Sequence, residues 1–213
     1  MANINAPKGF VPKRHLDGSP FNGQYQTFLC DSGDATAIFV GDVVKLAGSA
    51  GVAGQVVGGM DVEGVPTITK AGTGTVSAGT SIVGVVVGFN PDPINLLNKY
   101  RLASTNRLAY VVTDPSVIYE VQEDATAPFA AADMGLNAQF TGGTGNTTTG
   151  ISTSLVMNAG KATTSTLPVR VIGLSKRPDN AFNTAGAGSD PAKFEVMLNA
   201  TGVSLGGAGV AGT

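Results

Sequence analysis

Short apolar runs separated by turn-forming residues fill the chain from residue 25 onward. The runs are rich in Val, Ile, Thr, Phe and Tyr, and Gly, Asp, Asn or Pro bounds them. This pattern predicts β-strands joined by turns. Strands are expected at 25–29, 36–40, 43–46, 65–69, 82–89, 108–113, 117–121, 136–140, 151–157, 169–174 and 193–198. The run 82–89 is apolar on both faces and is therefore expected at the centre of the sheet system.

Helical signals are few. The stretch 123–135 offers Asp124 as a cap, Pro128 early and Gly135 as a stop, which predicts one or two helical turns. Residues 94–99, after Pro93, predict another short piece. No long amphipathic stripe is present, which argues against a coiled coil and a membrane-surface helix. The fold class predicted is all-β, a single β-barrel or jelly-roll-like sandwich with Gly/Thr-rich loops.

Three segments organise the chain: an extended N-terminal arm over 1–24, an all-β domain over 25–200 and a Gly-rich C-terminal tail over 201–213. Proline repeatedly interrupts the arm, which also contains several basic residues and the apolar residues Phe10, Val11, Leu16 and Phe21. Low-complexity stretches at 46–60 and 139–149 predict flexible loops or hairpin tips. The uncharged tail is either loose or an extended strand laid on a neighbour.

Composition supports the β prediction and narrows the partners. Gly accounts for 30 of 213 residues and charged residues for 13%, which disfavours a helical bundle. The net charge of −2 and the pI near 5.3 argue against general nucleic-acid binding. No Lys or Arg lies between Arg107 and Lys161. Either this is an ordinary solvated surface, or acidic and basic faces meet between identical subunits.

Catalytic and cofactor motifs fail on residue type or spacing. The single Cys30 excludes an intramolecular disulfide and, with the single His15, leaves too few ligands for a structural zinc site. The P-loop, the G-x-G-x-x-G fingerprint, the G-x-S-x-G elbow and the calcium loop are all absent. A paired-carboxylate site around Glu120, Glu123 and Asp124 stays open, although the chain lacks the Trp residues of sugar platforms. We therefore expect no enzyme activity, cofactor or metal site.

Signals for membranes and export are also missing. The longest strongly apolar run, 82–89, is far shorter than the roughly 18 residues of a spanning helix. The opening residues lack the basic-then-apolar order of a secretory signal, so synthesis in the cytoplasm is expected.

Two stretches carry a resemblance. Residues 5–18, NAPKGFVPKRHLDG, and 38–46, IFVGDVVKL, resemble the start of small head structural proteins of tailed bacteriophages. The resemblance implies a capsid decoration, or cement, protein that sits on the outer capsid surface of the virion after assembly in the host cytoplasm. It further implies a homotrimer that clamps neighbouring major capsid protein subunits, without a reaction and without direct contact to nucleic acid or membrane.

The arm is the predicted binding element. Its apolar side chains would bury against the shell, and its basic side chains would pair with acidic capsid residues. The predicted capsid-binding residues are Lys8, Phe10, Val11, Lys13, Arg14 and Phe21. Removal of residues 1–24 is expected to leave a folded domain. The alternative is a carbohydrate-binding or host-attachment module displayed on the virion, in which the Gly/Thr loops contact glycans.

Overall fold

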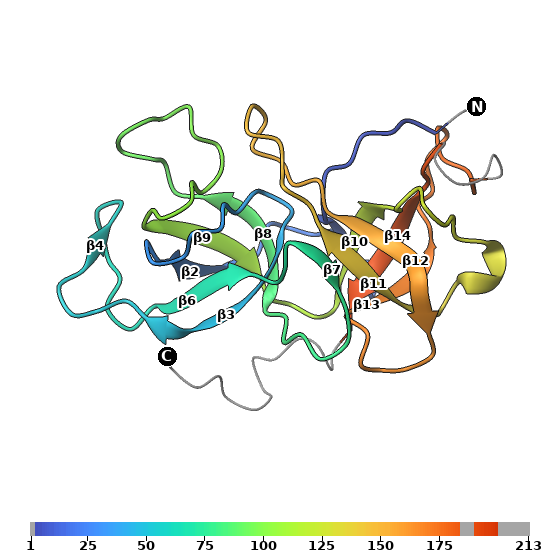
Figure 1. Cartoon of the computed structure of the whole chain (residues 1–213), viewed down its shortest axis with the longest axis horizontal. Helices are drawn as coiled ribbons and strands as arrows, with labels where there is room; N and C mark the ends of the chain where they lie inside the picture. Colours follow the sequence, from blue (N-terminus) through green and yellow to red (C-terminus); the bar gives the residue numbers. More distant parts are fainter. Residues whose placement is uncertain (1–2, 184–189, 200–213) are drawn as a thin grey trace.

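A computed structural model describes residues 3–183 and 190–199 of the chain and consists of β-strands and their connections, with one short 3-10 helix (Figure 1). The prediction of an all-β fold is confirmed. Within these residues, no helix has the length and apolarity needed to cross a bilayer. The predicted tail, 201–213, lies outside the described residues.

The first unit is a closed barrel. Its strands follow the order β2-β6-β3-β8-β9, and their pairs are antiparallel except for β2 with β6, which meet in parallel at Leu29 and Thr67. A small hairpin, β4 (Val56–Val57) with β5 (Met60–Asp61), projects from the barrel between β3 and β6. The barrel strands are β2 (Gln26–Cys30), β3 (Val43–Ala50), β6 (Pro66–Lys70), β8 (Gly84–Phe89) and β9 (Arg107–Val112).

The second unit is a seven-stranded antiparallel sheet. Its order is β1-β10-β14-β13-β11-β12, and β7 pairs with β11 outside this path. The sheet curls until residues after β10 meet β12, where Glu123 and Val156 form a parallel bridge. Its strands are β1 (Val11–His15), β7 (Gly74–Val76), β10 (Val117–Gln122), β11 (Asn137–Gly142), β12 (Leu155–Ala162), β13 (Val169–Leu174) and β14 (Lys193–Leu198).

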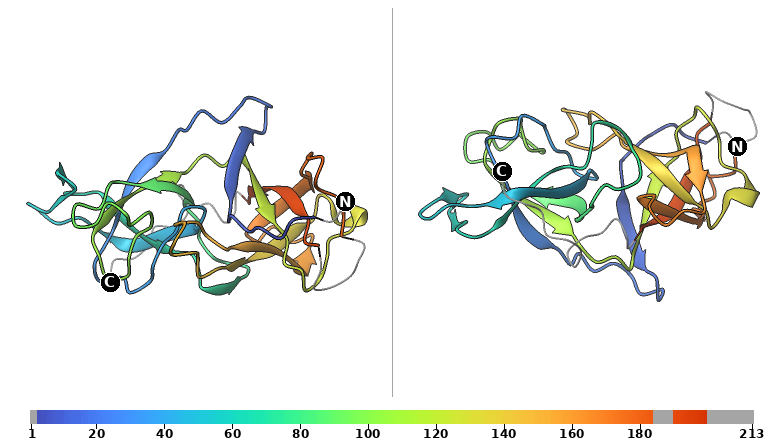
Figure 2. Two further views of the ribbon diagram at one scale, coloured as in Figure 1. Left: turned by 90° about the horizontal axis from the view of Figure 1, so that it is seen from above. Right: turned by 60° about the horizontal axis from the view of Figure 1, so that its bottom comes forward.

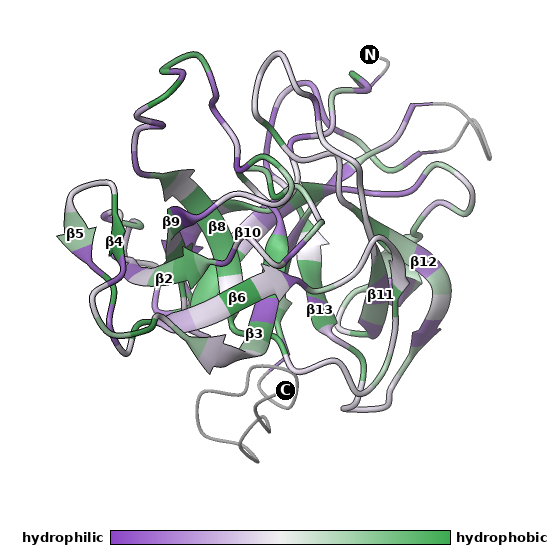
Figure 3. Ribbon diagram, turned by 60° about the vertical axis from the view of Figure 1, so that its left-hand side comes forward, coloured by the Kyte–Doolittle hydropathy of each residue, from purple (hydrophilic) through white to green (hydrophobic). Residues whose placement is uncertain are grey.

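One apolar core extends through both units. Val43 and Val85 from the barrel belong to the same buried cluster as Tyr119, Phe140 and Phe194 from the second sheet. A separate cluster fills the barrel and contains Phe28, Ile38, Val44, Ile68 and Val111. Figure 3 shows apolar residues along the strands of both units. The two units are therefore packed together through shared apolar contacts.

A buried polar cluster also joins the units. Asp42, at the start of β3, accepts hydrogen bonds through Oδ1 from the hydroxyls of Ser152, at 2.5 Å, and Ser154, at 3.2 Å. Its Oδ2 lies 2.9 Å from Lys70 Nζ, and Lys70 also donates to the carbonyl of Gly143. Both buried charges in the cluster therefore have partners. The hydrogen bonds from Ser152 and Ser154 to Asp42 attach the residues before β12 to the barrel.

Several expected elements differ in the structure. Residues 94–99 contain turns and bends without a helix, whereas 123–135 forms one short 3-10 turn, Ala131–Asp133, as the prediction of one or two turns allows. The expected strand 36–40 is reduced to isolated bridges at Ile38 and Val40. Strands β1, β4, β5 and β7 form where none was predicted. These are short, and Pro or Gly in or next to them masks their alternation of polar and apolar positions.

Candidate functional site

The N-terminal segment is part of the folded body. Strand β1 pairs with β10, with Val11 opposite Glu120 and His15 opposite Val117. Before β1, the N–H of Phe10 donates to the carbonyl of Gly41 in the barrel, at 3.0 Å. Figure 2 shows β1, in blue, between the barrel and the other strands of the second sheet. The segment therefore contacts both units, which corrects the prediction of an arm outside the strand pattern.

A close backbone approach explains a glycine in this segment. Gly9 has φ +65°, and a Cβ atom there would lie 2.5 Å from the carbonyl oxygen of Gly41. A side chain would therefore be strained and would also push the segment away from the barrel.

Phe10 is a core residue. Its side chain is 1% exposed, and its ring makes edge contacts to Tyr119 and Phe140, with centroids 6.3 and 5.4 Å away. A ring buried in this way contributes mainly to the packing of the core, and only its edge reaches the surface cavity described below. Phe10 therefore packs in the core, and because β1 also pairs with β10 we now expect residues 1–24 to contribute to folding.

Lys13 and Arg14 form ion pairs within the chain. Lys13 Nζ lies 3.2 Å from Glu120 Oε2, and Arg14 lies 2.8 Å from Glu195 Oε2. Burial by itself raises the pKa of Glu120, but the hydrogen bonds from Ser175 and Lys13 and the nearby positive charges hold its pKa below the ordinary 4.5. The two cations therefore tie β1 to β10 and β14 within the chain, and their predicted pairing with capsid carboxylates stays a prediction.

Other acidic residues that were considered as a possible subunit face are also paired within the chain. Lys161 Nζ lies 2.7 Å from Asp133 Oδ2, and Arg177 lies 3.1 Å from Glu120 Oε1. In both ion pairs an acidic residue from the stretch without Lys or Arg is paired with a basic residue that follows that stretch. Acidic residues that have no basic neighbour in the sequence thus have one in the folded chain.

Four of the six predicted binding residues line one surface cavity. Lys8, Phe10, Val11 and Phe21 meet at a surface hollow of about 270 Å³. Its other lining residues are Pro12, Val40, Gly41, Val86 and Val87. Lys8 is exposed and has no ion pair with a described residue. The cavity thus combines an apolar lining with an unpaired cation.

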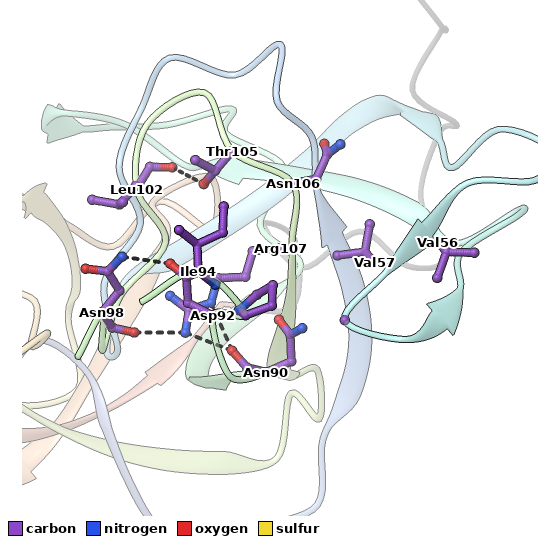
Figure 4. Close-up of a pocket in the computed structure, with 12 residues that line it drawn as sticks. Val56, Val57, Asn90, Asp92, Ile94, Asn98, Leu102, Thr105, Asn106 and Arg107 are labelled. Atoms are coloured by element: carbon purple, nitrogen blue, oxygen red, sulfur yellow. Dashed lines mark hydrogen bonds between the residues drawn. The ribbon is translucent and has the colours of Figure 1, made fainter. Parts of the chain in front are cut away.

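A larger cavity, of about 390 Å³, lies between the β4–β5 hairpin and the loop that connects β8 to β9 (Figure 4). Asp92 accepts a hydrogen bond from Asn98 Nδ2 at 2.7 Å, and Arg107 donates to the carbonyls of Asn90, Asn98 and Tyr100. Burial lowers the pKa of Arg107. These polar groups bind one another and leave Val56, Val57, Ile94 and Leu102 as the apolar lining.

Sequence reasoning missed the larger cavity. Its walls come from residues 56–58 and 90–107, which are far apart in the chain and converge only when the barrel closes. The only local signal was the apolar content of 94–97, which instead supported a short helix.

The residues considered for chemistry are held in structural contacts. His15 Nδ1 lies 3.2 Å from Asp114 Oδ2 and 3.3 Å from Ser116 Oγ. A triad requires the carboxylate and the hydroxyl on different ring nitrogens, so this arrangement does not match one. Cys30 is buried, and burial raises the pKa of its thiol to about 12.

Glu123 is fully buried and holds two loops. Its carboxylate accepts hydrogen bonds from the N–H groups of Phe129 and Ala192, both at 2.8 Å. Burial, together with the charge of Asp124, raises the pKa of Glu123. Across the described ranges, no group of three or more His, Cys, Asp or Glu side chains is placed to hold a metal ion.

The chain was compared with known proteins in three ways. Scans of family models, curated proteins and solved structures each found no match.

Proposed function

We propose that the chain is a non-enzymatic virion structural protein that binds the outside of a phage capsid and clamps adjacent major capsid protein subunits. One observation carries the proposal. The two stretches that resemble phage head proteins, 5–18 and 38–46, meet at the cavity of Lys8, Val11 and Phe21, where both contribute lining residues. Residues far apart in sequence thus form one surface, which is held rigid by strand pairing and ion pairs.

The chemistry of this cavity defines the partner. Its apolar lining accepts a large apolar side chain, whose burial is worth about 1.5–3 kcal/mol. The unpaired Lys8 at the rim favours a carboxylate beside that side chain. We therefore assign the cavity an apolar residue next to an acidic residue of the major capsid protein.

The clamp acts mainly through apolar contacts and backbone hydrogen bonds. Residues 46–60, 71–91 and 134–160 contain no charged residue, so the parts of these segments that reach the surface offer no ion pairs to a partner. Many such contacts together slow dissociation. Salt weakens them little, because they do not depend on charge. The homotrimer implied by the resemblance would multiply these contacts on each particle.

Add-back to stripped particles tests the proposal. Wild-type protein should bind purified capsids in fixed stoichiometry and reduce the release of packaged DNA on heating, in low and in high salt. Lys8→Glu and Phe21→Ser should each weaken binding, whereas Lys176→Glu, an exposed charge reversal elsewhere, should not. Thermal melting of each variant checks that the fold is retained.

Two results would contradict the proposal. If restored particles release DNA as readily as stripped particles, the cement function is wrong. If Lys8→Glu and Phe21→Ser bind capsids like the wild type, the cavity is not the binding surface. Specific retention on a glycan array without recovery on capsids would favour the carbohydrate-binding alternative.

A further inference from the structure

Exposed apolar side chains gather at one end of the barrel. Six of the nine large apolar side chains that are exposed among the described residues lie on the β4–β5 hairpin region and on the loop after β8. Ile94, Leu97 and Leu96 are 95%, 82% and 78% exposed. Apolar colour on this loop and hairpin is visible in Figure 3. We call this set the apolar tip: Val52, Val56, Met60, Ile94, Leu96 and Leu97.

The tip contains both projecting side chains and a cavity. The cavity of about 390 Å³ lies between the two segments, and Val56 and Ile94 belong both to its lining and to the tip (Figure 4). Asn90, Asp92, Asn98 and Arg107 are held by hydrogen bonds among themselves and to backbone carbonyls, and the lining is mainly apolar. A large apolar side chain matches this cavity better than a polar ligand does.

Charges of opposite sign flank the tip. Lys99 is exposed at the foot of the loop, beside Gly150 of the connection between β11 and β12. Asp61 and Glu63 are exposed on the hairpin side, where Asp61 pairs with Val56 across the β4–β5 ribbon. A loop that crosses the hairpin of another copy would therefore bring Lys99 close to these carboxylates.

We propose that the apolar tip is a self-association surface, in which Leu96 or Leu97 of one copy enters the cavity of a second copy. The second copy is the occupant that the charges favour, because it supplies the projecting leucines, the cavity and both signs of charge from one surface. Burial of side chains that are now almost fully exposed supplies the main driving force. The inference is independent of capsid binding.

Analytical ultracentrifugation of the purified full chain, without capsids, tests this inference. The wild type should form a species of two or more chains as its concentration rises. The double variant Leu96→Ser/Leu97→Ser should raise the dissociation constant by at least about tenfold, the scale of an interface hot spot. The matched control Leu16→Ser removes a 56% exposed leucine outside the tip and should associate like the wild type.

A charge exchange tests the orientation of the two copies. Lys99→Glu alone and Asp61→Lys/Glu63→Lys alone should each weaken association, and the triple exchange should restore it. These residues are exposed, so the variants should keep the fold, which melting curves verify.

A wild type that stays monomeric at all concentrations would overturn the inference, as would an oligomer that the leucine variants leave unchanged. An oligomer whose triple exchange is no tighter than the single charge variants would overturn the proposed pairing. Because no capsid is present, these outcomes are separate from a failure of the cement function.

Discussion

Lys70 Nζ lies 2.9 Å from Asp42 Oδ2, with both side chains buried where the barrel meets the second sheet. Asp42 also accepts hydrogen bonds from the N–H of Phe39 and from two serine hydroxyls. Phe39 in turn stacks on Tyr100, with ring centroids 4.5 Å apart. The ion pair thus organises the contact between the two units, and its stability depends on both partners being present.

Removal of one charge should therefore be costly. We expect Asp42→Ala to lower the free energy of unfolding by about 3–5 kcal/mol, because it leaves the Lys70 ammonium buried without its carboxylate. Urea denaturation measures the change. Asp61→Ala, at an exposed carboxylate, is the control and should change stability by less than about 0.5 kcal/mol. Equal small effects for both variants would show that the pair is not a structural requirement.

Phe10 should be essential for stability. Phe10→Ala removes a ring from a packed aromatic cluster and should cost about 3–5 kcal/mol, as measured by denaturant unfolding. Lys8→Ala, two positions earlier at an exposed side chain, should leave stability nearly unchanged. Deletion of residues 1–24 should have a larger effect than Phe10→Ala, because β1 is lost as well. A cooperatively folded deletion variant of wild-type stability would contradict this.

The Cys30 thiol should be inert in the native protein. Burial keeps reagents away from the thiol. It also raises the pKa of the thiol to about 12, so little of the reactive thiolate is present at mildly alkaline pH. A chromogenic disulfide reagent should label it only when denaturant unfolds the chain, and the labelling rate should follow the unfolding curve. Rapid labelling of the native protein would show that β2 opens locally.

Acid should weaken the attachment of β1. The pKa of Glu120 is lowered in the folded protein, so its ion pairs contribute stability that is fully present above its unfolded pKa near 4.5. That contribution is lost as the pH falls through the lowered folded pKa. Stability measured from neutral pH to about pH 3 should therefore fall more steeply for the wild type than for Glu120→Gln. Parallel curves would show that Glu120 is not linked to folding.

The strands that the sequence predicted well are those whose apolar runs are uninterrupted. Residues 169–174 and 193–198 form strands with the predicted bounds. Strand β1 was missed because Pro12 interrupts its pattern, and the structure accommodates this with a shift of register between Pro12 and Arg14. The one or two helical turns predicted in 123–135 correspond to the single 3-10 turn Ala131–Asp133, and the segment before it is held by the hydrogen bond from the N–H of Phe129 to Glu123.

The candidate surface was predicted in part. Lys8, Val11 and Phe21 were recognisable as apolar and basic side chains in a segment with many prolines. Their assembly into one cavity depends on Val40 and Val86 from the barrel, which no local pattern connects to the N-terminus. The pairing of Arg14 with Glu195 spans 181 positions and is likewise a property of the fold.

This long span sets the order of events during synthesis. At roughly 5–20 residues per second, about ten to forty seconds separate translation of Arg14 from translation of Glu195. Strand β1 can therefore pair with β10 first, and Arg14 gains its ion-pair partner on β14 only later. The ion pair that holds Arg14 thus forms only after Glu195 has been synthesised, so the contacts that fix the N-terminal segment are completed late in translation.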